Sequence, residues 1–382
     1  MSLFDTGASA VADPFLRRAY ELAELARGET APNPLVGCVI VRDGAIVGEG
    51  HHVRAGLPHA EAVALEQAGT RALGATAYVT LEPCTHEGRT PPCAPALVRA
   101  GVARVVIGMR DPNPAVTGRG SEYLRARDVE VSFAADDSPM RRQNEAWLAR
   151  LTTGRPFVRV KIALTLDGHL SMAQHRRSRI TGSGGQQVTM LLRQRAGAIA
   201  VGASTVAVDD PELTVRDVGS ARIERQRLRV ILSRTSIPTA ECHLISDGLA
   251  PTLVIASDAA DDDAVRHLQE CGVRVARYPL ASGIAGALVE VALSGVDDLL
   301  VEAGPGLLTA LYDARCIDEL VTVHAGGVAG PEAPAAFLGP RDGESATLVL
   351  RYVAIDAAVI DGDAAVVWRP VPTLSDTHAE AV

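Results

Sequence analysis

The chain has 382 residues, and at roughly 150 residues per domain this length predicts about two domains. Hydrophobic residues make up 47% and charged residues 22%, which excludes a chain that is disordered throughout. The net charge of −9 argues against a protein whose main task is to bind nucleic acid or an anionic membrane.

The lack of a visible targeting signal and the small number of cysteines predict a cytoplasmic protein. No apolar run approaches the roughly 18–20 residues of a membrane helix, and no secretory signal is visible at the N-terminus. Six cysteines are too few for a disulfide framework. Four are isolated and are interpreted as small buried residues: Cys38, Cys242, Cys271 and Cys316. Cys84 and Cys93 instead lie close together in a Pro-rich segment.

The N-terminal part of the chain alternates between helix and strand patterns. Apolar residues at three- to four-residue spacing predict a helix over 14–27, with Asp13 as its N-cap. Two strands joined by Asp43-Gly44 are predicted within 35–50, and a helix over 59–67. The next predicted elements are a strand over 77–81, a helix over 94–100 and a strand over 104–108. This order indicates an α/β domain that ends near residues 146–155.

A second and larger α/β domain is predicted to begin at Pro156 with a strand inside 157–168. Further strands are predicted over 198–202, 228–232, 252–256, 273–277, 298–304, 319–325 and 364–370. Helical patterns fall between several of them, including 185–195 and 307–314. We therefore assign the two domains to 13–148 and 156–371. Residues 372–382 show no pattern and are predicted to form a loose tail.

One histidine and two cysteines stand in a pattern that favours zinc. His59 and Glu61 begin a predicted helix, and Cys84 and Cys93 follow a predicted strand. One imidazole and two thiolates suit zinc and leave a fourth tetrahedral position for water, as in catalytic sites. Glu61 is two residues from His59, where it is placed to move a proton. Zinc deaminases share the pattern H-x-E…P-C-x-x-C, in which the Glu is the general acid and base.

Two simpler interpretations of these residues stay open. In the first, His59 caps a helix and both cysteines fill the core. In the second, His86 closes a structural zinc site with four protein ligands, which leaves Glu61 without a role.

These motifs resemble the family of bifunctional riboflavin-biosynthesis deaminase/reductases. In the first half the matching motifs are Asn33-Pro34-Leu35-Val36-Gly37, His59-Ala60-Glu61, Thr80-Leu81-Glu82-Pro83-Cys84 with Cys93, and Asp111-Pro112-Asn113-Pro114. The eight-residue spacer between the cysteines is typical of this family. In the second half they are Lys161, Thr165-Leu166-Asp167-Gly168, Asp209-Asp210-Pro211, Leu213-Thr214-Val215-Arg216 and Glu302-Ala303-Gly304-Pro305. The resemblance covers about residues 13–370.

The resemblance implies an N-terminal cytidine-deaminase-like α/β/α domain and a C-terminal dihydrofolate-reductase-like domain. It also implies two consecutive reactions on 2,5-diamino-6-ribosylamino-4(3H)-pyrimidinone 5′-phosphate. Zinc-activated hydroxide removes the amine, and NADPH then reduces the ribosyl group to ribityl. One Zn²⁺ per chain would be bound by His59, Cys84 and Cys93, with Glu61 as proton donor and acceptor. The implied pyrimidine and phosphate pocket comprises Asn33, His52, His86 and Arg89.

A strand that enters a Gly-rich turn before a helix, at 299–306, is a place to seat a phosphate. An ordinary strand–helix turn has the same pattern. Residues 182–185 lack a preceding strand and are interpreted as a helix entry. By resemblance the cofactor site comprises Ala163, Thr205, Asp209, Gly304, Pro305 and Gly306, although Asp209 also fits a capping role. Arg179 is assigned to the same site as a cation for the 2′-phosphate of the cofactor or the phosphate of the substrate. By resemblance the ribosyl-phosphate site comprises Lys161, Arg193, Leu213, Arg216 and Glu302, and Arg177 is assigned to it as a further cation.

Departures from the family pattern cluster in the second half. Arg177-Ser178-Arg179 stands where the family has Ser-x-Trp, Ser233-Arg234 stands where it has Asp-Ser, and 325–330 replaces Pro-Lys-Leu-Leu-Gly. The alternative function is therefore a deaminase whose second domain has lost or changed its activity. The acidic charge, the long spacer and the 3% aromatic content oppose a nucleic-acid base deaminase. The resemblance implies a small phosphorylated substrate and a homo-oligomer, a dimer or tetramer.

Overall fold

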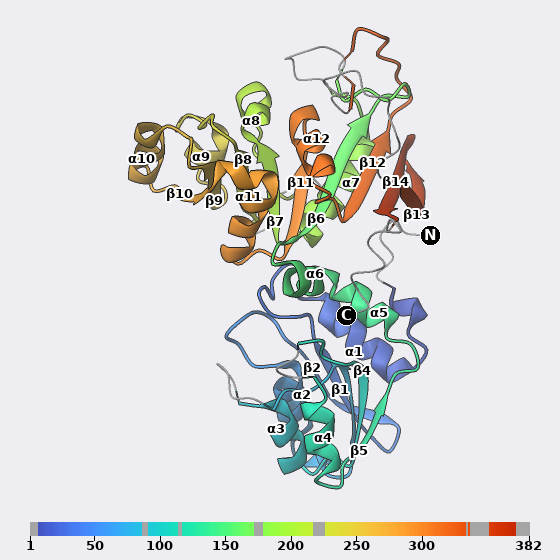
Figure 1. The fold of residues 1–382 in the computed structure, drawn as a ribbon. Coiled ribbons are helices and arrows are strands. Elements are labelled where there is room, and N and C mark those ends of the chain that lie inside the picture. The colour runs from blue at the N-terminus through green and yellow to red at the C-terminus, as the bar shows by residue number, and fades with distance from the viewer. Residues whose placement is uncertain are drawn as a thin grey trace. The chain divides into compact units, whose positions relative to one another are not determined.

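The computed structural model shows two compact units, one of Asp5–Thr153 and one that begins at Gly154 (Figure 1). The structure describes residues 7–85, 91–113, 117–171, 179–216, 226–333, 335–336 and 351–371. The tail predicted at 372–382 lies outside these residues. None of the helices within the described ranges is long and apolar enough to cross a membrane.

A five-stranded sheet forms the centre of the first unit, in the order β2-β1-β3-β4-β5. Its strands are β1 (Gly37–Arg42), β2 (Ala45–His51), β3 (Thr76–Leu81), β4 (Arg104–Met109) and β5 (Glu130–Phe133). The predicted hairpin is confirmed, and both Asp43 and Gly44 have positive φ, as its tight turn requires. Strand β5 is not among the predicted elements, because it is short and half-buried. Strands β3, β4 and β5 are parallel, so their carboxyl ends meet at one edge.

Helices cover both faces of this sheet. They are α1 (Pro14–Glu24), α2 (Ala60–Ala68), α3 (Cys93–Arg99), α4 (Arg119–Arg125), α5 (Ser138–Gln143) and α6 (Glu145–Thr153). Cys38 and Ile40 of β1 pack in one cluster with α2, α3 and α4, whereas Val39 and Val41 face α1. Alternate strand residues point to opposite faces, so the unit has an α/β/α arrangement. The predicted cap of α1 is confirmed, because Asp13 Oδ1 accepts from the N–H groups of Phe15 and Leu16.

Close helix–strand contact in this unit depends on glycines. A Cβ atom at Gly37 would lie 1.9 Å from the carbonyl oxygen of Ala19 in α1, and one at Gly50 would lie 2.4 Å from that of Ala60 in α2. Only glycine fits such an approach. The contact between β2 and α2 places the start of α2, and with it His59 and Glu61, beside the end of β2.

The second unit contains a nine-stranded sheet in the order β10-β9-β8-β7-β11-β6-β12-β14-β13. The strands are β6 (Phe157–Leu164), β7 (Ala198–Gly202), β8 (Leu228–Ser233), β9 (Thr252–Ser257), β10 (Arg274–Tyr278), β11 (Asp298–Glu302), β12 (Glu319–His324), β13 (Tyr352–Ile360) and β14 (Asp363–Pro370). All predicted strands are present. The additional strand, β13, lies at the sheet edge and is largely exposed, so it lacks a buried pattern.

Six helices of the second unit pack on its sheet: α7 (Ser183–Arg195), α8 (Ala203–Asp209), α9 (His243–Ser246), α10 (Asp262–Glu270), α11 (Gly283–Leu293) and α12 (Pro305–Asp313). One core cluster contains α11 and α12, and the other contains residues of α7, α8, α9 and α10. β11 follows the edge strand β10 in the chain but inserts between β7 and β6, parallel to both. In such sheets ligands bind at the carboxyl ends of the strands where the strand order reverses.

Candidate functional site

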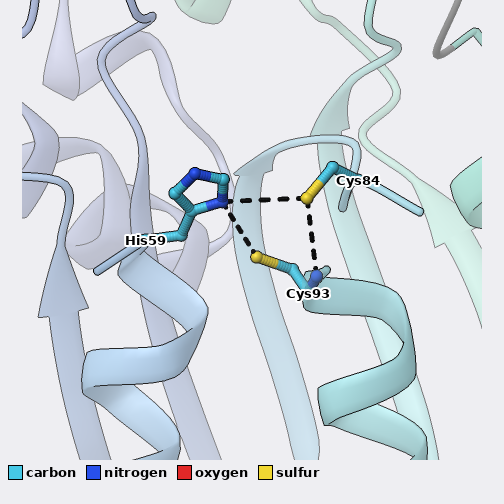
Figure 2. A group of neighbouring side chains, drawn as sticks. All are labelled: His59, Cys84 and Cys93. Atoms are coloured by element: carbon cyan, nitrogen blue, oxygen red, sulfur yellow. Dashed lines mark hydrogen bonds between the residues drawn. The ribbon is translucent and has the colours of Figure 1, made fainter. Parts of the chain in front are cut away.

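His59, Cys84 and Cys93 come together from three separate elements (Figure 2). His59 immediately precedes α2, Cys84 follows β3, and Cys93 is the first residue of α3. His59 Nδ1 lies 3.2 Å from Cys93 Sγ and 3.7 Å from Cys84 Sγ. The backbone N–H of Cys93 points at Cys84 Sγ over 3.4 Å. His59 occupies the N-cap position of α2, but its side chain makes no capping bond, so helix capping does not account for it.

The three ligand atoms fit a zinc ion. All of them lie within 4.8 Å of one another. Tetrahedral zinc with ordinary Zn–N and Zn–S lengths places such atoms about 3.5–3.8 Å apart, close to the separations found. Hydrogen bonding by Cys93, and also by His59, lowers the pKa of Cys84 to about 4 although burial opposes the shift. A thiolate is the form of cysteine that binds zinc.

Glu61 is the second residue of α2, in its first turn, with only 3% of its surface exposed. Burial raises the pKa of this carboxyl, and the charge of Cys84 raises it further. A raised pKa favours the uptake of a proton by this carboxyl. Within the described residues the ligand cluster consists of His59, Cys84 and Cys93 alone. Glu61 is therefore placed beside the metal position, where it can transfer protons.

A cavity of about 500 Å³ adjoins the cluster. Five residues predicted from the sequence line it together: Asn33, His52, His59, Glu61 and Cys84. Lining residues that were not predicted include Glu82, Asp111, Asn113 and Trp147. The Asp-Pro-Asn-Pro motif that follows β4 was the available signal for Asp111 and Asn113. His86 and Arg89 lie outside the described residues.

The buried carboxylate of Glu82 connects the end of β3 to the start of α4. Glu82 Oε2 accepts from the N–H of Gly118 at 3.1 Å, and Oε1 accepts from the N–H of Ser121 at 2.9 Å. A Cβ at Gly120 would lie 2.0 Å from the carbonyl oxygen of Pro83, so the chain approaches closely there. Because Cys84 is two residues further on, these contacts hold its segment in place.

In the second unit, Lys161, Arg193 and Glu302 form a cluster of charged groups. Arg193 Nε and Nη2 lie 2.6 and 2.9 Å from the two carboxylate oxygens of Glu302, and Nη1 donates to the carbonyl of Thr214 at 2.7 Å. Lys161 pairs with Glu302 in the β6–β11 register. Burial lowers the pKa of Lys161, whereas Arg193 and Lys161 lower the pKa of Glu302 against the effect of its burial. These three predicted residues share one site.

Leu213 and Arg216 lie on either side of Thr214, whose carbonyl accepts from Arg193. The side chain of Leu213 is buried in the core, and its φ is +51°, so its backbone alone can face a ligand. Arg216 donates to Glu212 at 2.6 Å, and its carbonyl accepts from Gln194 of α7 at 3.3 Å. Arg177 lies outside the described residues.

The predicted cofactor residues of α8 and of the turn before α12 lie close together, next to the carboxyl ends of β7 and β11. Gly304 is the N-cap residue of α12, and a Cβ there would lie 3.2 Å from Thr205 Oγ1, so the β7–α8 and β11–α12 turns are neighbours. Pro305 and Gly306 open the first turn of α12. Asp209 ends α8 four residues after Thr205 and shares its helix face. Ala163 is the penultimate residue of β6, and Arg179 is exposed ahead of α7.

The interpretation of 182–185 as a helix entry is confirmed. Gly182 and Gly185 donate their N–H groups to Asp363 Oδ2 at 2.9 and 2.8 Å. Ser233, one of the departures from the family pattern, has a structural role: its hydroxyl donates to the carbonyl of Ser236, and its carbonyl accepts from Tyr278 at 3.2 Å.

Two family models match the chain. The cytidine and deoxycytidylate deaminase zinc-binding region matches residues 10–109, and the RibD C-terminal domain matches residues 156–355. The riboflavin biosynthesis protein RibD of Synechocystis sp. is 41% identical over 85% of this chain and 88% of its own length. That of Escherichia coli is 40% identical over 84% and 89%. The chain belongs to the RibD family.

Solved RibD structures share both units. Acinetobacter baumannii RibD superposes with a TM-score of 0.84 at 36% identity, over 94% of this chain and 98% of that one. The diaminohydroxyphosphoribosylaminopyrimidine deaminase/5-amino-6-(5-phosphoribosylamino)uracil reductase of Thermotoga maritima gives 0.78 at 31% identity, over 94% and 98%. The predicted fold classes are confirmed. As a RibD, the chain is a bifunctional deaminase/reductase of riboflavin biosynthesis, with a zinc site at His59, Cys84 and Cys93 and an NAD(P)H-dependent reductase domain.

Proposed function

We propose that residues 13–148 deaminate a ribosylaminopyrimidine 5′-phosphate and that residues 156–371 reduce its ribosyl group with NADPH. The observation that carries this proposal is the position of Glu61, buried beside the His59–Cys84–Cys93 cluster in a cavity of about 500 Å³. That volume lies in the range of small-molecule sites. The names of the RibD relatives support the choice of substrate.

In the deaminase step, water replaces the exocyclic amine of the pyrimidine, and ammonia leaves. Zinc bound by the three ligands supplies the Lewis acidity that makes water nucleophilic near neutral pH. Glu61 accepts a proton from the attacking water and passes it to the leaving amine, which its raised pKa permits. Asn33 contacts the ring from the cavity wall, and we retain His86 and Arg89 as predicted substrate contacts.

For the reductase step, NADPH bound by the second unit would supply a hydride to the anomeric carbon and leave as NADP⁺. The bond from that carbon to the ring oxygen would break, and the oxygen would take up a proton. We assign the ribosyl-phosphate end to the cluster of Lys161, Arg193 and Glu302, with the backbone of Leu213 and with Arg177 and Arg216. We assign the dinucleotide to Ala163, Thr205, Asp209 and the turn 304–306, where free N–H groups open α12. The exposed guanidinium of Arg179 suits the 2′-phosphate of NADPH.

A two-step assay with mass detection tests both halves. Zinc-loaded protein is expected to release ammonia from the pyrimidine and then to oxidise NADPH with the deaminated product. Glu61→Gln is expected to lower ammonia release by about 10²–10⁴-fold with unchanged zinc content. Glu66→Gln, an exposed change on the same helix, is the matched control. Full ammonia release by Glu61→Gln, or no NADPH oxidation with the deaminated product, would contradict the proposal.

A further inference from the structure

We infer that His52 is a positioning residue that orients the amide of Asn33, so that Asn33 presents Oδ1 as a hydrogen-bond acceptor to an N–H group of the pyrimidine. The inference rests on the proposed placement of the pyrimidine in the cavity of the first unit. It gives His52 a different role from the direct substrate contact that the family resemblance implied.

The contacts of His52 determine which ring nitrogen carries the proton. His52 Nδ1 lies 3.1 Å from the carbonyl oxygen of Pro58. A carbonyl only accepts hydrogen bonds, so Nδ1 must carry the hydrogen. The side chain is only 3% exposed, and its backbone N–H donates to the carbonyl of Val36 at 2.9 Å. The ring is therefore held from both its backbone and its Nδ1 side.

The second ring nitrogen then determines the orientation of Asn33. His52 Nε2 lies 3.0 Å from Asn33 Nδ2. With the hydrogen on Nδ1, the Nε2 of a neutral imidazole is an acceptor, and it receives an N–H from the amide. The reversed amide would place its oxygen, a second acceptor, against Nε2. The pair thus permits only one orientation of the Asn33 side chain.

This orientation leaves Asn33 Oδ1 available to a ligand. Asn33 lines the cavity, and among the described residues its amide is engaged only by His52. A diaminopyrimidine carries N–H donors on its ring and on its amino groups, and Oδ1 can accept from one of them. A site built to receive an N–H group discriminates strongly against analogues that lack it. Substrate selection at this wall of the cavity therefore depends on the Pro58–His52–Asn33 chain of hydrogen bonds.

His52 also touches the metal ligand His59, with ring centroids 5.4 Å apart in an edge-to-face arrangement. An effect of His52 on activity can therefore pass through Asn33 or through the zinc site. Zinc content separates the two routes, because the Asn33 route leaves it unchanged.

A double-mutant cycle on the full-length, zinc-loaded protein tests the inference. His52→Phe keeps a flat ring but removes the acceptor for Asn33, and Asn33→Ala removes the amide. Each single variant is expected to lower kcat/KM for ammonia release by about tenfold or more, as expected for one lost hydrogen bond. The double variant is expected to be no worse than Asn33→Ala alone. The control is His51→Phe on β2, a residue that is not among those lining the cavity, and it is expected to keep wild-type kcat/KM.

Additive losses in the double variant would overturn the inference, because His52 would then contact the substrate itself. Loss of zinc from His52→Phe would also overturn it, in favour of a role through His59. Where His52→Phe fails to fold, His52→Gln, which offers an amide oxygen to Asn33, replaces it and is expected to retain more activity than His52→Ala. Equal loss in these two variants counts against the inference. Ammonia release by the wild type tests the proposed function, whereas the double-mutant cycle tests this inference. Failure of one can therefore be distinguished from failure of the other.

Discussion

Arg193 and Glu302 form a two-point ion pair between α7 and the carboxyl end of β11, with Nε and Nη2 lying 2.6 and 2.9 Å from the two carboxylate oxygens. The residues are 109 positions apart in the chain. Lys161 on the neighbouring strand β6 adds a second positive charge beside the same carboxylate. Glu302 therefore holds two cations at the edge where the reductase substrate is proposed to bind.

Replacing Glu302 by Gln is expected to impair the reductase without affecting the deaminase. The change keeps the size of the side chain but removes the charge shared by Lys161 and Arg193. A hydrogen bond to a charged group contributes about 1.5–3 kcal/mol, so kcat/KM for NADPH oxidation with the deaminated product should fall roughly 10- to 100-fold. Ammonia release serves as the internal reference.

Asp262→Asn is the control for Glu302→Gln. It breaks the pair of Arg277 and Asp262, whose charged atoms are 2.5 Å apart, in an exposed part of the same unit. Exposed pairs contribute little, so its reductase rate should match that of the wild type. A folded Glu302→Gln with a normal reductase rate would remove this carboxylate from the proposed site.

Chelation of zinc should separate the two activities. All three ligands lie in the first unit, and the second unit has its own core clusters. Metal-free protein is therefore expected to lose ammonia release while it still oxidises NADPH with the deaminated product, and added zinc should restore the first activity. Ammonia release from protein shown to be metal-free would contradict the assignment of the zinc site.

Glu82→Gln is expected to weaken zinc binding. Both oxygens of Glu82 accept backbone N–H groups, from Gly118 and Ser121. A Gln side chain has one acceptor oxygen, and its NH₂ group would face the other N–H. The buried mismatch should cost about 1–3 kcal/mol and loosen the segment that carries Cys84. Competition with a chelator measures the change in zinc affinity.

The matched control for Glu82→Gln is Asp13→Ala, which removes the cap of α1 in the same unit. It should cost about 1 kcal/mol of stability and leave zinc affinity unchanged. Equal zinc affinity in Glu82→Gln and the wild type would show that Glu82 stabilises α4 without positioning Cys84.

The stability of the second unit should fall in acid because of Glu319. Burial alone would raise the pKa of this carboxyl, but Arg159 and Arg369 hold it below its usual value. Glu319 accepts from Arg159 Nε, and Arg369 Nη2 lies 2.7 Å from its other oxygen. Because the folded-state pKa is depressed, this stabilisation is fully present above the unfolded value of about 4.3 and is lost as pH falls toward the folded value.

Thermal unfolding between pH 7 and pH 3 measures this effect. Glu319→Gln leaves two buried or half-buried cations without their shared charge, so it should cost about 3 kcal/mol at pH 7, or roughly 5–10 °C in Tm. The difference from the wild type should shrink as pH falls below about 4. Glu270→Gln, an exposed change on α10, is the control. A difference that is constant with pH would show that the charge of Glu319 is not responsible.

The sequence by itself determined the α/β class, most strands and the zinc ligands. Buried strands such as 198–202 and 252–256 are short apolar runs with clear ends, so their positions were predicted correctly without tertiary information. The zinc site was predictable because zinc binding requires particular residue types, and these occur in a recognisable order: His59, Glu61, Cys84 and Cys93. Elements with weak burial patterns, such as β5 and β13, were missed because nothing in their local sequence distinguishes them from loops.

Only the tertiary structure decided which groups act on one another. Three hydrogen-bonded groups join residues that are 19 to 109 positions apart. They are Asn33 with His52, Glu82 with Gly118 and Ser121, and Arg193 with Glu302. The tertiary structure also placed the side chain of Leu213 in the core, so that its backbone is the part left for the site that the family resemblance implied. Local patterns report the burial of each segment, whereas hydrogen-bond partners and shared charges depend on how the strands are ordered in the sheet, and this order arises from long-range packing.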